Sequence, residues 1–187
     1  PNAPREDVYR ISLQVAKSKS NVIVALGGGS TIDAAKAAAV LNTYSPAEVM
    51  EILGASVSDA DSIEPYFGTG LVSKMKEKTG RAVVPVVGVQ TAASSGAHLT
   101  KYSNITDPET GQKKLIVDEA IVPPASVFDF KITLDSPISL TLDGGLDGIA
   151  HAWEVFMGTS GPAYEKVKEV AELSIRLIVY GLQKIKK

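Results

Sequence analysis

Residues 22–36 constrain the fold of this chain more than any other stretch. They pass from an apolar run through three glycines into an alanine-rich segment, Val22-Ile-Val-Ala-Leu-Gly-Gly-Gly-Ser30-Thr-Ile-Asp-Ala-Ala-Lys36. The apolar run predicts a parallel strand covered on both faces, and the segment after the glycines predicts a helix. Ser30 is the expected N-cap of that helix, with Asp33 at the position of a capping-box acid. The pattern therefore indicates a strand–turn–helix unit of an α/β fold.

The three glycines of this unit predict a phosphate-binding turn. Because Gly27, Gly28 and Gly29 carry no Cβ, the backbone can turn sharply and approach a ligand closely. Free N–H groups and the positive end of the helix dipole favour an anion at the same point. The alternative interpretation is a tight turn that binds nothing, since glycine-rich turns also occur for packing.

Composition and charge exclude several function classes. The chain has no cysteine, which excludes disulfides, thiolate catalysis and cysteine-ligated zinc. Its 19 basic and 21 acidic residues give a net charge of −2, and no basic patch indicates nucleic acid as a partner. No apolar run reaches the about 18 residues that span a membrane, and no signal-peptide pattern opens the chain. We expect a cytoplasmic protein with neither a nucleic acid nor a membrane as its partner.

Strand and helix signals alternate along the chain and then give way to helices alone. The expected helices cover residues 8–18, 31–42, 45–53, 142–157 and 164–184, while residues 55–70 are expected to form a loop or a short helix. The expected strands cover residues 22–26, 81–89 and 125–130, and a pair of strands around a turn within 103–117. We therefore predict an α/β domain over residues 1–134 and an α-helical domain over residues 135–187.

A second chemical feature is an aspartate and a histidine spaced for one face of a helix. Asp147 and His151 are four residues apart, so on a helix they project from the same side, with Asp143 one turn earlier. A carboxylate and an imidazole in this arrangement can bind one divalent metal ion. The alternative is an ordinary Asp–His pair, because two ligands do not complete a metal site.

Residues 90–102 are rich in hydroxyl groups and follow a predicted strand, where α/β sheets hold their ligands. The hydroxyl groups of this segment can donate hydrogen bonds to a phosphate or ribose; they belong to Thr91, Ser94, Ser95 and Thr100. The segment also contains His98. A plain hydrophilic loop is the alternative interpretation. Lys113 and Lys114 can neutralise an anion, although taken alone they are more typical of solvated lysines.

Together these motifs resemble the iron-containing, metal-dependent alcohol dehydrogenases. Residues 27–36 resemble the family's Gly-Gly-Gly-Ser-x-x-Asp-x-(Ala/Ser)-Lys motif, and residues 91–100 its Thr-Thr-x-Gly-Thr-Gly-Ser-Glu-x-Thr loop. Residues 146–154 resemble its Met-Asp-Ala-Leu-x-His-Ala-x-Glu motif, and Lys113 lies near the position of its cofactor-facing lysine. Even Asn2-Ala-Pro4 resembles the family's Asn-Pro. These segments follow the family's order and approximate spacing.

The resemblance also has departures. His98 replaces the glutamate of the family's loop. The family holds its metal with one aspartate and three histidines, of which only Asp147 and His151 have counterparts. The family chain is much longer, so we expect residues 1–187 to be a fragment that lacks the first strands of the cofactor domain and most of the helical domain. By themselves these residues are not expected to catalyse alcohol oxidation.

The resemblance implies a Rossmann-like dinucleotide-binding domain followed by the start of an all-helical domain. It implies an oxidoreductase that uses NAD or NADP and Fe²⁺ or Zn²⁺ to interconvert a small alcohol and an aldehyde or ketone. The metal would bind Asp147 and His151, and no catalytic protein side chain is implied. The cofactor would contact Gly28, Gly29, Ser30, Thr91, Ser94, Thr100, Tyr102 and Lys113. We also expect a homo-oligomer, specifically a dimer.

Two alternatives stay open. One is a different chemistry on the same scaffold, as in a glycerol dehydrogenase or a dehydroquinate-synthase-like lyase. The other is a nucleotide-binding fragment with no activity of its own.

Overall fold

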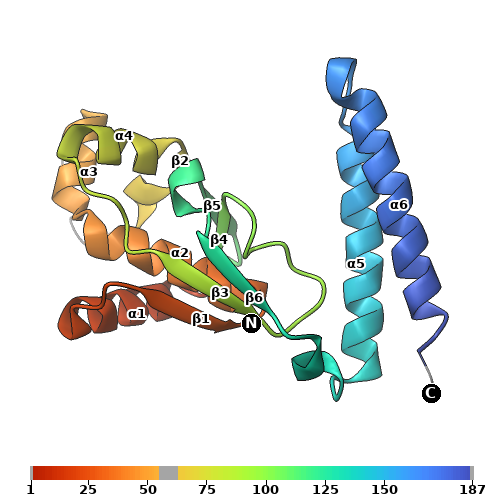
Figure 1. The fold of residues 1–187 in the computed structure, drawn as a ribbon. Helices are drawn as coiled ribbons and strands as arrows, with labels where there is room; N and C mark the ends of the chain where they lie inside the picture. Colours follow the sequence, from red (N-terminus) through yellow and green to blue (C-terminus); the bar gives the residue numbers. More distant parts are fainter. Residues whose placement is uncertain (1, 55–62, 186–187) are drawn as a thin grey trace. The chain divides into compact units, whose positions relative to one another are not determined.

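The chain forms two compact units in the computed structural model, which describes residues 2–54 and 63–185 (Figure 1). The first unit contains Pro1–Gln90 and Gly96–Phe128, and the second contains Thr91–Ser95 and Asp129–Lys187. The domain boundary expected at residue 134 stays a prediction. Part of the segment expected to be a loop or short helix, residues 55–62, lies outside the described residues.

Most of the expected helices and strands are present. The helices of the first unit are α1 (Arg5–Ser18), α2 (Gly29–Thr43), α3 (Pro46–Leu53) and α4 (Leu71–Thr79), with short 3-10 helices η1 (Glu64–Tyr66) and η2 (Glu119–Ile121). Its strands are β1 (Ile23–Gly27), β2 (Gly68–Thr69), β3 (Val86–Gln90), β4 (Tyr102–Thr106), β5 (Lys113–Val117) and β6 (Ala125–Phe128). The second unit has α5 (Ile138–Met157) and α6 (Tyr164–Leu182), preceded by η3 (Phe130–Thr133) and η4 (Gly161–Ala163). Helix α4 was not predicted from the sequence.

Two three-stranded sheets organise the first unit. One is parallel, in the order β1–β3–β6, with Ala25 opposite Gly88 and Gly88 opposite Ser126. The other has the order β2–β5–β4, with β4 antiparallel to β5. A parallel sheet with helices, followed by a region of helices, confirms the predicted fold class: a Rossmann-like α/β unit and then the start of a helical region.

Helix α2 lies at the centre of the first unit because it is buried on every side. Every residue from 32 to 40 is buried, and five of these nine are alanine. Such small side chains let α1, β1, β3 and β4 approach the helix backbone closely. One core, which includes Val8 and Ile105, packs on one side of α2, and a smaller core with Ala25 and Val86 lies between α2 and the parallel sheet.

The start of α2 differs from the sequence expectation, in which Ser30 is the N-cap. The N-cap is Gly28, whose carbonyl already accepts hydrogen bonds from the N–H groups of Thr31 and Ile32. The Ser30 hydroxyl instead accepts a hydrogen bond from the backbone N–H of Asn2, at 3.1 Å. The expected capping box is therefore wrong, because the helix begins one residue before the serine.

The parallel sheet differs from its sequence expectation in two respects. Strand β3 begins only at Val86, because Pro85 has no N–H to donate to the ladder. Coverage on both faces is also wrong for the described residues. Helix α2 covers the face that contains Ala25, whereas Val24 and Leu26 on the opposite face are 63% and 64% exposed.

Glycines let α5 and α6 pack closely in the second unit, where the two helices run side by side (Figure 1). A Cβ on Gly145 would lie 2.8 Å from the Leu182 side chain, and one on Gly148 would lie 3.1 Å from Ile178. Within the ranges that the structure describes, no helix combines the length and apolar character needed to cross a membrane.

We predict that Gly88→Ala destabilises the first unit. The new Cβ would lie 2.9 Å from the His98 Cβ, an atom that rotation of the side chain cannot move away. Overpacking of this kind costs about 1–3 kcal/mol of the free energy of unfolding, which urea denaturation would measure. Gly181→Ala is the control, because nothing lies within 4 Å of its added Cβ. Equal stability of the two variants would contradict the contact.

Candidate functional site

The glycine turn joins β1 to α2 at the carboxyl end of the parallel sheet. Gly27 ends β1 and Gly29 begins α2. The N–H groups of Gly29 and Ser30 belong to the first helical turn, where helix geometry provides no intrahelical acceptor. Together with the positive end of the helix dipole, they can hold a phosphate.

Packing also requires glycine at this turn. None of Gly27, Gly28 and Gly29 has a positive φ, so the turn uses their lack of a Cβ rather than a left-handed backbone. A Cβ on Gly27 would lie 2.6 Å from the Thr31 Cβ. Gly27 thus serves the packing of the turn itself, and the two glycines that follow it are half-buried at the start of the helix.

The residues before α1 lie beside the glycine turn. Asn2 and Ala3 have φ angles of +80° and +43°, and this backbone lets the Asn2 N–H reach the Ser30 hydroxyl. A pocket of about 260 Å³ opens here between the starts of α1 and α2, lined by Ala3, Pro4, Asp7, Arg10, Ile11, Ser30, Thr31 and Ala34. Apart from the family resemblance, no role for Asn2 could be predicted, because its contact with Ser30 depends on the fold.

Lys36 connects α2 to the segment that was predicted to contact the cofactor. Its side chain is buried, and the ammonium donates hydrogen bonds to the carbonyl of Thr100 at 2.6 Å and to that of Tyr102 at 2.9 Å. Burial lowers the pKa of Lys36 to about 8, although the neighbouring Asp33 carboxylate acts in the opposite direction. Sequence reasoning missed Lys36 as a contact because an isolated lysine on a helix is usually exposed.

Further polar contacts link α2 to β4. The Ser103 hydroxyl donates to the Asp33 carbonyl at 2.8 Å, and the Asn104 amide donates to the Asp33 carboxylate at 3.4 Å. Burial raises the pKa of Asp33, partly offset by the hydrogen bonds from Asn104 and by the charge of Lys36. The start of β4 is thus fixed to α2 by side chains from both elements.

His98 is buried against the parallel sheet, with 3% of the residue exposed. Its ring meets Phe128 edge to face, with centroids 4.6 Å apart, and its carbonyl accepts a hydrogen bond from the Ser126 hydroxyl at 2.8 Å. Neither ring nitrogen has a hydrogen-bond partner in the structure. Burial and the nearby charge of Lys36 lower the pKa of His98, so the ring is neutral at neutral pH.

The predicted cofactor residues are divided between the two units. Thr91 and Ser94 belong to the second unit, where Ser94 packs against α5 so closely that a Cβ on Gly144 would lie 2.8 Å from the Ser94 Cβ. A small pocket of about 100 Å³ lies beside this contact, and Thr133, Ser136 and Thr141 help to line it. The remaining predicted residues belong to the first unit; they are Gly28, Gly29, Ser30, Thr100, Tyr102 and Lys113.

Lys113 is exposed at the start of β5, on the same face of its sheet as Tyr102. The strand register separates the two residues, because Tyr102 pairs with Val117 whereas Lys113 pairs with Thr106. Four strand positions correspond to about 13 Å. The structure therefore does not bring Lys113 next to Tyr102, and a contact of Lys113 with the cofactor stays a prediction.

Asp147 and His151 lie one turn apart on α5, with the His151 Nδ1 3.6 Å from the Asp147 Oδ2. Their side chains are 53% and 64% exposed, so a metal ion can reach both. No group of three or more histidine, aspartate or glutamate side chains suited to a metal occurs among the residues that the structure describes. The pair can thus supply two ligands, and its spacing equally suits an ordinary ion pair.

An apolar groove lies beside this pair. It has a volume of about 490 Å³ and runs between α5 and α6, where His151 lines it together with Ala152, Val155, Val167 and Val170, among others.

The comparisons with known proteins agree on one family. A model of the family described as iron-containing alcohol dehydrogenase matches residues 1–130. A bifunctional aldehyde-alcohol dehydrogenase of Escherichia coli is 30% identical over 176 residues, which cover 90% of this chain and 18% of that protein. An NAD-dependent methanol dehydrogenase of Bacillus methanolicus is 30% identical over 137 residues, covering 73% of this chain and 30% of that protein.

Solved structures of the same kind share the fold. A sulfoacetaldehyde reductase from Bifidobacterium kashiwanohense, solved in complex with NAD⁺, matches with a TM-score of 0.70 at 25% identity, over 98% of this chain and 44% of that one. A 1,3-propanediol oxidoreductase matches with a TM-score of 0.77 at 24% identity, over 98% of this chain and 42% of that one. The chain thus spans less than half the length of each of these relatives.

We predict that the first unit loses stability as the pH falls below about 6.5, the ordinary histidine value. The pKa of His98 is lowered in the folded state, so below that value the unfolded chain binds the proton more readily and unfolding is favoured. His98→Leu should reduce this loss in urea denaturation between pH 5 and 7.5. His151→Ala, which removes the exposed histidine, is the control and should behave as wild type. An unchanged pH dependence in His98→Leu would disprove the assignment.

Proposed function

Because the chain belongs to the iron-containing alcohol dehydrogenase family, we propose that it is part of a metal-dependent oxidoreductase that uses NAD or NADP. The proposed reaction interconverts a small alcohol and an aldehyde or ketone by hydride transfer. The observation that carries this proposal is the β1–glycine–α2 unit, in which first-turn N–H groups lie at the carboxyl end of a parallel sheet.

The dinucleotide would bind through its phosphates at the start of α2. The N–H groups of Gly29 and Ser30 are the proposed phosphate donors, and Gly28 leaves room for the phosphate to approach. The other proposed contacts are Thr100, Tyr102 and Lys113 from the first unit and Thr91 and Ser94 from the second. When bound, the nicotinamide supplies the hydride chemistry, and the protein supplies binding and orientation.

Asp147 and His151 are the proposed metal ligands of this chain. A carboxylate and an imidazole 3.6 Å apart, both accessible, suit a divalent ion such as Fe²⁺ or Zn²⁺ as two of its donors. When bound, such an ion acts as a Lewis acid on the substrate oxygen. The proposal assigns no nucleophile or other catalytic side chain to this chain.

The relatives support a small substrate. Their names specify methanol, 1,3-propanediol and sulfoacetaldehyde. The proposal therefore takes a short alcohol or aldehyde as the substrate. A dimeric state and a cytoplasmic location belong to the same proposal.

We predict that Gly28→Val weakens dinucleotide binding at least about tenfold, a loss of about 1.4 kcal/mol. The valine side chain would occupy the space that the phosphate needs at the N-cap of α2. Calorimetry with NADH and NADPH on the longest form of the protein that its gene encodes would measure the change. Gly181→Val is the control, because its position is open. Unchanged affinity in Gly28→Val would exclude the glycine turn as the phosphate site.

We predict that His151→Ala loses bound metal and alcohol oxidation together in the same full-length protein. The variant removes one of the two donors that α5 contributes. Metal content and turnover with a panel of short alcohols would be measured side by side. Glu172→Ala, which replaces an exposed acid on α6, should retain both. Full metal occupancy with normal turnover in His151→Ala would make the histidine an ordinary surface residue.

A further inference from the structure

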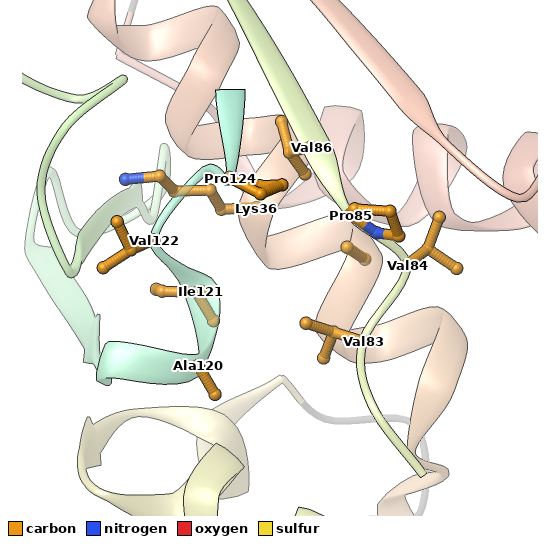
Figure 2. A pocket seen from close by; sticks show the side chains of 10 residues that line it. Lys36, Val83, Val84, Pro85, Val86, Ala120, Ile121, Val122 and Pro124 are labelled. Carbon is orange, nitrogen blue, oxygen red and sulfur yellow. The ribbon is translucent and has the colours of Figure 1, made fainter. Parts of the chain in front are cut away.

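The stem of Lys36 lies against apolar side chains at the amino end of the parallel sheet. A pocket of about 160 Å³ occurs there, just before β3 and β6, and the residues around it include Val84, Pro85, Val86 and Pro124 (Figure 2). In Figure 2 the Nζ end of Lys36 points away from Val83 and Val84. The methylene groups of Lys36 thus form part of the apolar lining of this pocket, and the amine points away from Val83 and Val84.

On that side the ammonium binds two carbonyls that are two residues apart. Its distances to the oxygens of Thr100 and Tyr102 are 2.6 and 2.9 Å. Lys36 is seven residues after Gly29, which corresponds to about 10 Å along the helix axis. A rigid helix therefore links the first-turn N–H groups to the backbone at the start of β4.

Among the residues that the structure describes, two titratable groups interact with Lys36. Asp33 lies one turn earlier on α2, and His98 approaches from the segment before β4. The pocket residues on the other side are valine, alanine, isoleucine and proline. Because His98 is neutral at neutral pH, Asp33 supplies the counter-charge.

Stability alone does not account for this lysine. Removing an ammonium from water carries a desolvation cost, and apolar side chains of similar shape often replace buried charges without loss of stability. Lys36 as a whole residue is 1% exposed, and its lowered pKa reflects that desolvation cost. What the lysine adds is a charged donor that fixes two backbone carbonyls in one place.

We propose that Lys36 is a positioning residue for the dinucleotide, holding Thr100 and Tyr102 at a fixed distance from the glycine turn. The inference rests on the proposed function, since Thr100 and Tyr102 are the cofactor contacts that it positions. Lys36 does not itself touch the phosphate turn, because its hydrogen bonds end at the two carbonyls.

The test compares Lys36→Met with wild type and with Lys74→Met, which replaces an exposed lysine on α4. Methionine matches the stem and removes the donor. Calorimetry with NADH and NADPH on the full-length protein should show about tenfold weaker binding for Lys36→Met, the order expected when a charged hydrogen-bond donor is lost. Amide hydrogen exchange should be faster at residues 99–104 in this variant. Thermal stability should be equal or higher, which a purely stabilising role would not produce.

Wild-type protein gives a second measurement that needs no variant. Between pH 8 and about 10.4, the ordinary lysine value, the unfolded chain holds the Lys36 proton while the folded chain releases it. The contribution of Lys36 to the free energy of unfolding therefore rises with pH between these two values. Dinucleotide affinity should fall in the same window, because the neutral amine binds the carbonyls less strongly. These opposite trends distinguish positioning from stabilisation.

The outcomes separate this inference from the proposed function. If wild-type protein binds neither dinucleotide, the proposed function fails and the inference fails with it. If wild type binds and Lys36→Met binds equally well with unchanged exchange, only the positioning role is wrong. If Lys36→Met does not fold, an affinity that stays constant from pH 7 to 10 overturns the inference, and a fall above about pH 8 supports it.

Discussion

The burial of α2 on all sides is the constraint on which the rest of the first unit depends. A helix surrounded by α1 and by strands of both sheets can tolerate only small side chains on most of its surface, and alanine meets this condition. The same enclosure means that a polar side chain on α2 must find its partner in a neighbouring element. Lys36 does so with the carbonyls of Thr100 and Tyr102, and Asp33 does so with the amide of Asn104 in β4.

This enclosure joins two features that occur at different places in the sequence. The glycine turn begins α2. Further along the same helix, Lys36 donates hydrogen bonds to the carbonyls of Thr100 and Tyr102. A shift of the helix would therefore move the proposed phosphate donors and the start of β4 together. The imidazole of His98, whose nitrogens have no hydrogen-bond partner among the described residues, adds no charge to this arrangement at neutral pH.

Several of these features could be predicted because they depend on local pattern. The strand before the glycines, the helix after them and the helix expected over residues 45–53 follow from periodicity and residue type. Other features depend on what packs where. The sequence alone could not show that the Ser30 hydroxyl binds the Asn2 N–H instead of capping α2, because this depends on where Asn2 lies. The separation of Lys113 from Tyr102 depends on strand register. For Lys36, the available signal was its neighbours, because the other residues from 34 to 39 are all alanine and indicate a buried stretch of helix.

The two units are interleaved along the chain. The backbone passes from the first unit to the second after Gln90, returns at Gly96, and passes to the second again after Phe128. Three covalent crossings thus connect two bodies, and neither corresponds to one uninterrupted stretch of the gene. A recombination event that exchanged only the portion after Phe128 would separate Gly144 from the Ser94 against which it packs. The helical unit can therefore be inherited or grafted intact only together with the five-residue segment that lies inside the coding sequence of its neighbour.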